Sequence, residues 1–113
     1  MAYPTVQTFR TTFGLGETFR DVADEIVQEH LQAGSDQADV WLQLGGYTTP
    51  LSAWGKDLDR AVCEVAAFHM LKEVVGFNPD AGNDKMIEER ATAARKEILL
   101  MAVLQSSHLV SGP

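Results

Sequence analysis

The chain has 113 residues, of which 16 are acidic and nine are basic, giving a formal net charge of −7 at pH 7. Its length and its hydrophobic content of 45 % suit one domain with a compact core. The acidic balance argues against binding of DNA through its phosphates, because such binding depends on clustered lysine and arginine. The single cysteine, Cys63, excludes an internal disulfide and a thiolate metal cluster.

The sequence predicts neither a signal peptide nor a membrane span. The opening MAYPTVQTFR lacks the order of charged and then apolar residues that a signal peptide has. The longest apolar run, Ile98 to Leu104, is far shorter than the roughly 20 residues that cross a bilayer. We therefore expect a soluble protein that acts in a cytoplasm.

Two helices are predicted in the first half of the chain. A short helix over about residues 5–12 is followed by glycines, and a long helix is predicted from Phe19 to Leu44 with Thr18 as its N-cap. We favour a continuous long helix, although a break at Gly34 with Ser35 capping a second helix is the alternative. A glycine on the apolar stripe would let another helix approach closely. The predicted stripe consists of Val27, Leu31, Gly34, Ala38, Trp41 and Gly45.

A central helix is predicted to start between Ser52 and Lys56, after a loop that follows Gly45 and Gly46. Its stretch AVCEVAAFHML contains only two polar residues, Glu64 and His69. A helix that is apolar on most of its circumference is normally buried. Gly76 and the nearby Pro79 are expected to end it. The deepest residues are predicted to be Leu58, Val62, Val65, Phe68 and Val75.

The last helix is predicted to begin near Asn83 or Asp84, either of which can cap it. Beyond Ile98 every face of this helix is apolar, so one side must be covered by something other than its own bundle. Residues 1–105 are predicted to form an all-α domain, a small bundle of three main helices plus a short N-terminal helix. Residues 106–113 are predicted to be a flexible, irregular C-terminal tail. The predicted apolar stripe is Ile87, Ala91, Ala94, Ile98 and Met101.

The residues do not predict an enzyme, a cofactor or a metal site. A calcium loop starting at Asn78 fails because Gly82 would occupy a ligand position and Asn83 the glycine position. The histidines lack the spacing of metal ligands, and Cys63 is expected to be an inert buried thiol. We therefore interpret the turn between residues 76 and 84 as structural.

Apolar and aromatic residues exceed what three helices of this length can readily bury. Each has an alternative interpretation as core, but together they favour burial against another copy or a partner. The tail is expected to order only on docking. The interface candidates are Trp41, Tyr47, Trp54, Phe77, Leu100, Leu104, His108, Leu109 and Val110.

The order of these features resembles the head–tail adaptor (connector) proteins of tailed bacteriophages, in particular the head–tail joining family of Mu-like phages. The resemblance covers the opening YPTVQTFRTTFG, the helix EHLQAGSDQADVWLQLGGY, the turn GFNPDAGND and the last helix IEERATAARKEILLMAV. Its most specific part is the segment from ADVWLQL through YTTPLSAWGKDLDRAVCEVAAF. The chain departs from the family in lacking a longer acidic insert before the long helix, and in Gly34 where alanine is more usual.

The resemblance implies a structural virion protein located in the neck. It would be made in the host bacterial cytoplasm and would form a ring, commonly of twelve copies, beneath the portal. Its partners would be other copies of itself, the portal protein and the next neck or tail-completion protein. DNA would pass through the ring without specific binding, which suits an acidic chain that repels phosphate. The alternative is a small regulatory or inhibitory helical module that binds one protein partner as a monomer or dimer.

Overall fold

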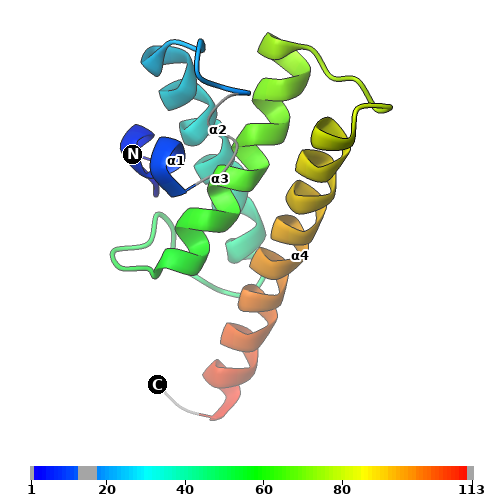
Figure 1. Ribbon diagram of the computed structural model, residues 1–113. Helices are drawn as coiled ribbons and strands as arrows, with labels where there is room; N and C mark the ends of the chain where they lie inside the picture. Colours follow the sequence, from blue (N-terminus) through cyan, green and yellow to red (C-terminus); the bar gives the residue numbers. More distant parts are fainter. Residues whose placement is uncertain (1, 13–17, 112–113) are drawn as a thin grey trace.

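The computed structural model describes residues 2–12 and 18–111, without the side chains of residue 12 and of residues 105–111. Within that part of the chain all regular structure is helical, which confirms the predicted bundle of three main helices and one short helix (Figure 1). The elements are α1 (Val6–Thr12), α2 (Asp24–Gln43), α3 (Lys56–Met70), the π-helical turn η1 (Leu71–Val75) and α4 (Gly82–Ser111).

Helix α3 lies at the centre and contacts α1, α2 and α4. It starts at the predicted place, and most of its side chains are buried, as its composition indicates. Cys63 is only 1 % exposed, and burial raises the pKa of its thiol to about 12. The thiol is therefore protonated at neutral pH and acts as a small apolar core group, as expected.

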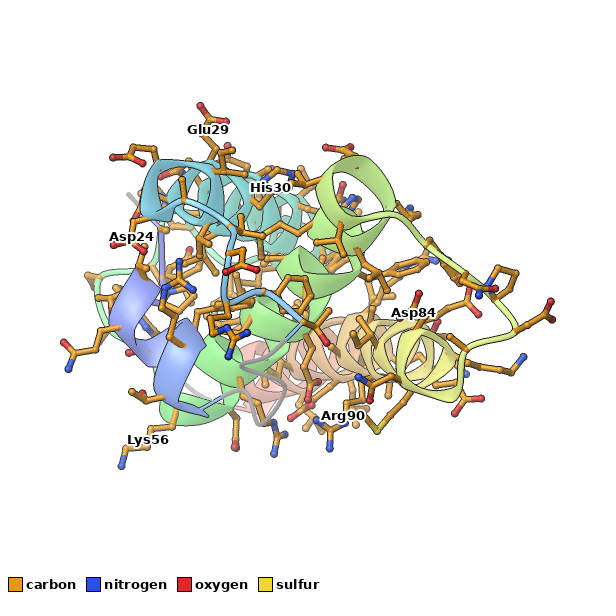
Figure 2. The ribbon with its side chains drawn as sticks, turned by 45° about the horizontal axis from the view of Figure 1, so that its top comes forward. Asp24, Glu29, His30, Lys56, Asp84 and Arg90 are labelled. Atoms are coloured by element: carbon orange, nitrogen blue, oxygen red, sulfur yellow. The ribbon has the colours of Figure 1, made fainter. Side chains whose placement is uncertain are left out.

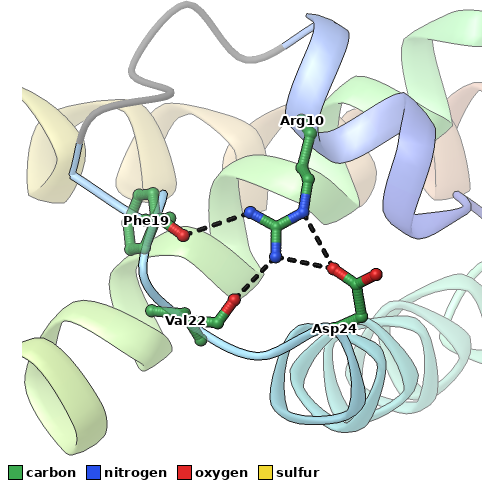
Figure 3. A network of polar contacts seen from close by, with 4 residues as sticks. All are labelled: Arg10, Phe19, Val22 and Asp24. Carbon is green, nitrogen blue, oxygen red and sulfur yellow. Dashed lines mark hydrogen bonds and ion pairs between the residues drawn. The ribbon is translucent and has the colours of Figure 1, made fainter.

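Helix α2 begins five residues later than predicted, at Asp24 instead of Phe19. Residues 18–21 form a turn, and the side chain of Phe19 is buried in the core. The guanidinium of Arg10 donates hydrogen bonds to the carbonyls of Phe19 and Val22 and pairs with Asp24 at 2.7 Å (Figure 3). These bonds from a distant arginine hold the segment as a turn, and the local sequence carries no sign of them.

Gly34 lies inside a continuous α2, which confirms the favoured interpretation. A Cβ atom at this position would lie 3.4 Å from the Val62 side chain and carbonyl, and 3.6 Å from the Cβ of Ala66. Helix α3 therefore passes close to the glycine, as the stripe predicted. These distances are within or at the edge of ordinary van der Waals contact.

Gly34→Ala is expected to raise the free energy of unfolding by up to about 1 kcal/mol. Alanine is favoured over glycine in a helix interior by about this amount, and its methyl group fits against Val62 with little movement. Urea unfolding followed by circular dichroism measures the change. Gly34→Leu, the control for crowding, should lower stability because its side chain cannot fit between α2 and α3. A loss of stability in the alanine variant would contradict the packing described.

The C-terminal end of the central helix differs from the prediction. Val75 is 44 % exposed and Phe68 is only partly buried, so neither is among the deepest residues. The α-helix continues as the π-helical turn η1, where the Gly76 N–H donates to the carbonyl of Leu71 at 2.7 Å. The wider turn rotates the last side chains away from the positions that an α-helix would give them. Gly76 has a φ of 108°, which favours glycine, and it ends the helix as predicted.

Helix α4 begins at Gly82, slightly before the predicted caps, and Asp84 accepts a hydrogen bond from the Asn78 N–H instead of capping the helix start. Its backbone remains helical to Ser111. The last helix therefore extends beyond residue 105, where the tail was predicted to begin, while residues 112 and 113 lie outside the described part. The flexibility of this segment remains a prediction.

No helix in the described ranges, 2–12 and 18–111, is long and apolar enough to cross a membrane.

Candidate interaction surface

Exposed apolar side chains gather where the C-terminal half of α4 meets the end of α2. Leu44 is 75 % exposed, Leu100 57 %, Val103 59 % and Leu104 54 %. On the opposite face of α4, Ile98 and Ala102 are buried against the bundle; Met101, predicted for this stripe, is only partly buried. The last helix is thus apolar on both its covered and its uncovered sides, as its composition predicted. We call Leu44, Leu100, Val103 and Leu104 the apolar end patch.

Gly45 joins the two parts of this patch. A Cβ atom at residue 45 would lie 2.1 Å from the carbonyl oxygen of Ala102, so the backbones of α4 and of the α2 C-terminus are in direct contact. Leu44 and Val103 are the sequence neighbours of these two residues, so their backbones lie close together where the two segments touch. Beyond this contact α4 continues past the ends of the other helices (Figure 1). The last turns of α4 therefore project from the bundle.

The aromatic candidates in the loop after α2 are engaged within the chain. Trp54 packs edge-on against Tyr3 with a centroid distance of 4.7 Å, and its indole N–H donates to Asp59 at 2.8 Å. The Tyr3 hydroxyl donates to Asp39 and accepts a hydrogen bond from the Leu51 N–H. Burial, and then the bond to Asp39, raise the pKa of Tyr3 to about 12. These bonds fasten the loop to the N-terminus and α2.

The remaining candidates occupy three different places. Tyr47 and Trp41 are partly buried against the core that α2, α3 and α4 share. Phe77 packs edge-on against Phe68, with ring centroids 5.5 Å apart. Leu100 and Leu104 belong to the apolar end patch, whereas the side chains of His108, Leu109 and Val110 lie outside the described part.

Leu44 and Val103 were not among the predicted interface residues. Leu44 lies off the predicted stripe of its helix, and an apolar residue outside the stripe was the signal that could have identified it. Val103 belongs to the run in which every face is apolar, so periodicity alone could not tell which of its members face the bundle.

A second feature is a groove of about 380 Å³ between α2 and α4, with α3 and η1 below it. Lys72 Nζ stands 4.4 Å from the ring centroid of Phe68, and the guanidinium carbon of Arg95 lies 5.8 Å from that of Trp41. His69 also lines the groove; burial, and then the charge of Lys72, lower its pKa. Among the described residues that line it, none is acidic. We call it the cationic groove.

Glu64 of α3 is half-buried and lies near the charges of Arg90 and Glu97 on α4. Burial raises the pKa of its carboxyl, against the opposing charges of Arg60 and Arg90. Arg60 itself pairs with Glu97 on α4 at 3.0 Å. The ionised form of Glu64 is therefore less favourable in the folded chain than in the unfolded one.

Glu64→Gln is expected to leave stability unchanged at pH 4 and to raise it slightly at pH 7. The folded pKa lies above the ordinary value of 4.5, so ionisation above that pH costs stability, and glutamine removes this cost. Urea unfolding at both pH values measures the change in the free energy of unfolding. The paired variant Glu97→Gln, which breaks a surface ion pair, serves as control. Lower stability of the Glu64 variant at pH 7 would mean that attraction to the two arginines exceeds the effect of burial.

The turn between η1 and α4 is organised by its own side chains. The Asn78 amide oxygen accepts a hydrogen bond from the Asp80 N–H, and Asp84 accepts one from the Asn78 N–H. Elsewhere, His30 connects α2 to η1 through Glu73 at 3.1 Å. In the described part of the chain no three histidine, cysteine, aspartate or glutamate side chains are grouped as metal ligands would be.

Comparison with known proteins does not assign the chain to a family. No family model matches the sequence, no curated protein matches it, and no solved structure matches the fold.

Proposed function

We propose that the chain is a structural virion protein that joins the head of a tailed phage to its tail, as a ring beneath the portal. The proposal starts from the resemblance in sequence order to head–tail adaptors. The observation that carries it in the structure is the apolar end patch on a projecting helix. Such a patch on a small acidic protein favours a role in assembly.

The energetics of the patch support a permanent contact. Full burial of a leucine side chain contributes about 1.5–3 kcal/mol, and three of the four members of the patch are leucines. Leu100 and Leu104 lie one turn apart on α4, and exposed apolar surface of this kind typically marks protein contacts. We assign the patch and the helix end beyond it to docking on the portal. The residues after 104 would add contacts on binding.

The charge of the chain supports passage of DNA through the ring. With seven more acidic than basic residues, the chain repels phosphate overall, so a channel lined by it would let DNA slide. The Arg10 and Arg60 side chains are both engaged in ion pairs with carboxylates, which reduces their availability for phosphate.

Leu100→Ser combined with Leu104→Ser is expected to give DNA-filled heads without tails in the phage that encodes the protein. The two substitutions remove apolar area from the patch, but both sites are more than half exposed, so folding should be preserved. Electron microscopy of lysates shows whether the heads carry tails, and circular dichroism of the purified variant shows whether it folds. Infectious particles at the wild-type yield would contradict the proposal.

The matched control is Val74→Ser combined with Val75→Ser. These valines are also exposed, but they lie in η1 and not on the patch. The control should give normal particles. An equal loss of tails in both variants would show that exposed apolar groups matter only for solubility. A complex of one copy of this chain with one copy of a partner protein would favour the regulatory module instead.

A further inference from the structure

The cationic groove carries positive charge, which is unusual in a chain whose net charge is −7. Nine basic residues are spread over 113 positions, yet Lys72 and Arg95 line one groove whose described lining residues include no carboxylate. Both cations lie over aromatic rings, and neither forms an ion pair with a carboxylate within the described part of the chain. The groove therefore offers positive charge and aromatic surface to an acidic partner.

Helix α2 carries a matching acidic surface on another face. Glu25, Glu29 and Asp36 are exposed, and Gln32 between them donates to Asp36 at 2.9 Å. Their spacing of four, three and four residues places them along one line of the helix. Figure 2 shows Glu29 pointing outward from α2. We call Glu25, Glu29, Gln32 and Asp36 the acidic stripe.

The acidic stripe cannot reach the groove of its own chain. The α2 residues that line the groove, Gln37 and Trp41, are rotated from the stripe by roughly 120° about the helix axis, at 100° per residue. The two surfaces therefore face different directions on one molecule. A contact between different surfaces of identical copies is heterologous, and it closes into a ring when the rotation permits.

We propose that the acidic stripe of one copy binds in the cationic groove of the next copy, and that this contact forms the ring. The inference rests on the proposed function and adds the lateral contact to it. Glu25 and Glu29 supply carboxylates to Lys72 and Arg95, and the rings of Phe68 and Trp41 supply apolar surface. Because these charges are at the surface, the contact weakens as salt screens them.

Charge reversal tests the contact. The stripe variant is Glu25→Lys with Glu29→Lys, and the groove variant is Lys72→Glu with Arg95→Glu. Each is expected to lower the self-association constant about tenfold at low salt, and the four substitutions together should restore it, because complementarity returns. Sedimentation equilibrium at up to about 1 mM protein detects dissociation constants as weak as about 1 mM. Circular dichroism verifies folding.

The control is Lys85→Glu with Lys96→Glu, which changes the net charge as the groove variant does but at exposed sites outside the groove. It should leave the association constant within about twofold. Equal effects of the control and the groove variant, no restoration in the fourfold variant, or no self-association of the wild type at about 1 mM would overturn the inference.

The same variants separate this inference from the proposed function. If either charge-reversed protein still completes infectious particles at the wild-type yield, the lateral contact is wrong but the adaptor role remains. If the contact behaves as expected while the apolar patch variant still joins heads to tails, the adaptor proposal fails and the contact remains.

Discussion

Val62→Asp is expected to leave the protein unfolded at room temperature. Val62 is 0 % exposed at the middle of α3, and its side chain would lie 3.4 Å from a Cβ atom at Gly34 of α2. Aspartate there would bury a carboxylate without a partner, or force its protonation, at a cost of several kcal/mol. A small domain has a total stability of about 5–15 kcal/mol, and a chain of this length lies at the lower end.

The matched control is Val40→Asp, which makes the same chemical change at a position that is 53 % exposed on α2. It should remain folded, with stability within about 0.5 kcal/mol of the wild type. Far-ultraviolet circular dichroism and the dispersion of amide signals in an NMR spectrum distinguish the two results. A folded, soluble Val62 variant would mean that α3 is not the centre of the bundle.

Gly45→Ala is the second large effect that we expect. The added methyl group would lie 2.1 Å from the carbonyl oxygen and 2.5 Å from the carbonyl carbon of Ala102. Both atoms belong to the backbone of α4, so no side-chain rotation relieves the clash. Overpacking typically costs about 1–3 kcal/mol, and we expect the upper part of that range because a helix must move. The last turns of α4 should separate from α2.

Gly55→Ala is the control, since nothing lies within 4 Å of a Cβ atom at that position. Its effect should be limited to the roughly 1 kcal/mol by which alanine is less favourable than glycine at an N-cap position. Urea unfolding gives the two stabilities, and hydrogen exchange of the α4 amides shows where the structure opens. Equal stabilities would contradict the close contact of Gly45 with α4.

The central helix and the continuity of α2 were predictable because both depend on local periodicity. The run AVCEVAAFHML is buried for the reason its composition indicates, and Gly34 lies on a stripe that faces α3. The start of α2 was not predictable, because Arg10, fourteen residues before Asp24, fixes that turn through bonds to backbone carbonyls. Long-range hydrogen bonds leave no periodic signal.

The candidate surface was predictable in part. Apolar residues on every face of the last helix indicated uncovered positions, and Leu100 and Leu104 are exposed. The aromatic residues of the loop were ambiguous, because an aromatic side chain suits both a core and an interface. Trp54 is held by Tyr3 and Asp59, which are distant in sequence or on the next helix, and only the fold brings them together.

The cationic groove could not be predicted at all. Lys72 and Arg95 are 23 residues apart, as their numbers show, and each is an ordinary charge on its own helical segment. The packing of α2 and α4 over α3 brings them to one groove with Trp41 and Phe68. Sites assembled from several helices require the fold before their charge pattern can be recognised.

Native mass spectrometry of the protein mixed with the portal protein encoded by the same genome is the most direct test of the adaptor role. We expect a complex of one portal with a ring of this chain, commonly of twelve copies. We also expect that complex to be lost when Leu100 and Leu104 are replaced by serine. Free portal and monomeric protein at every mixing ratio, or a complex that the serine substitutions leave intact, would contradict the adaptor role.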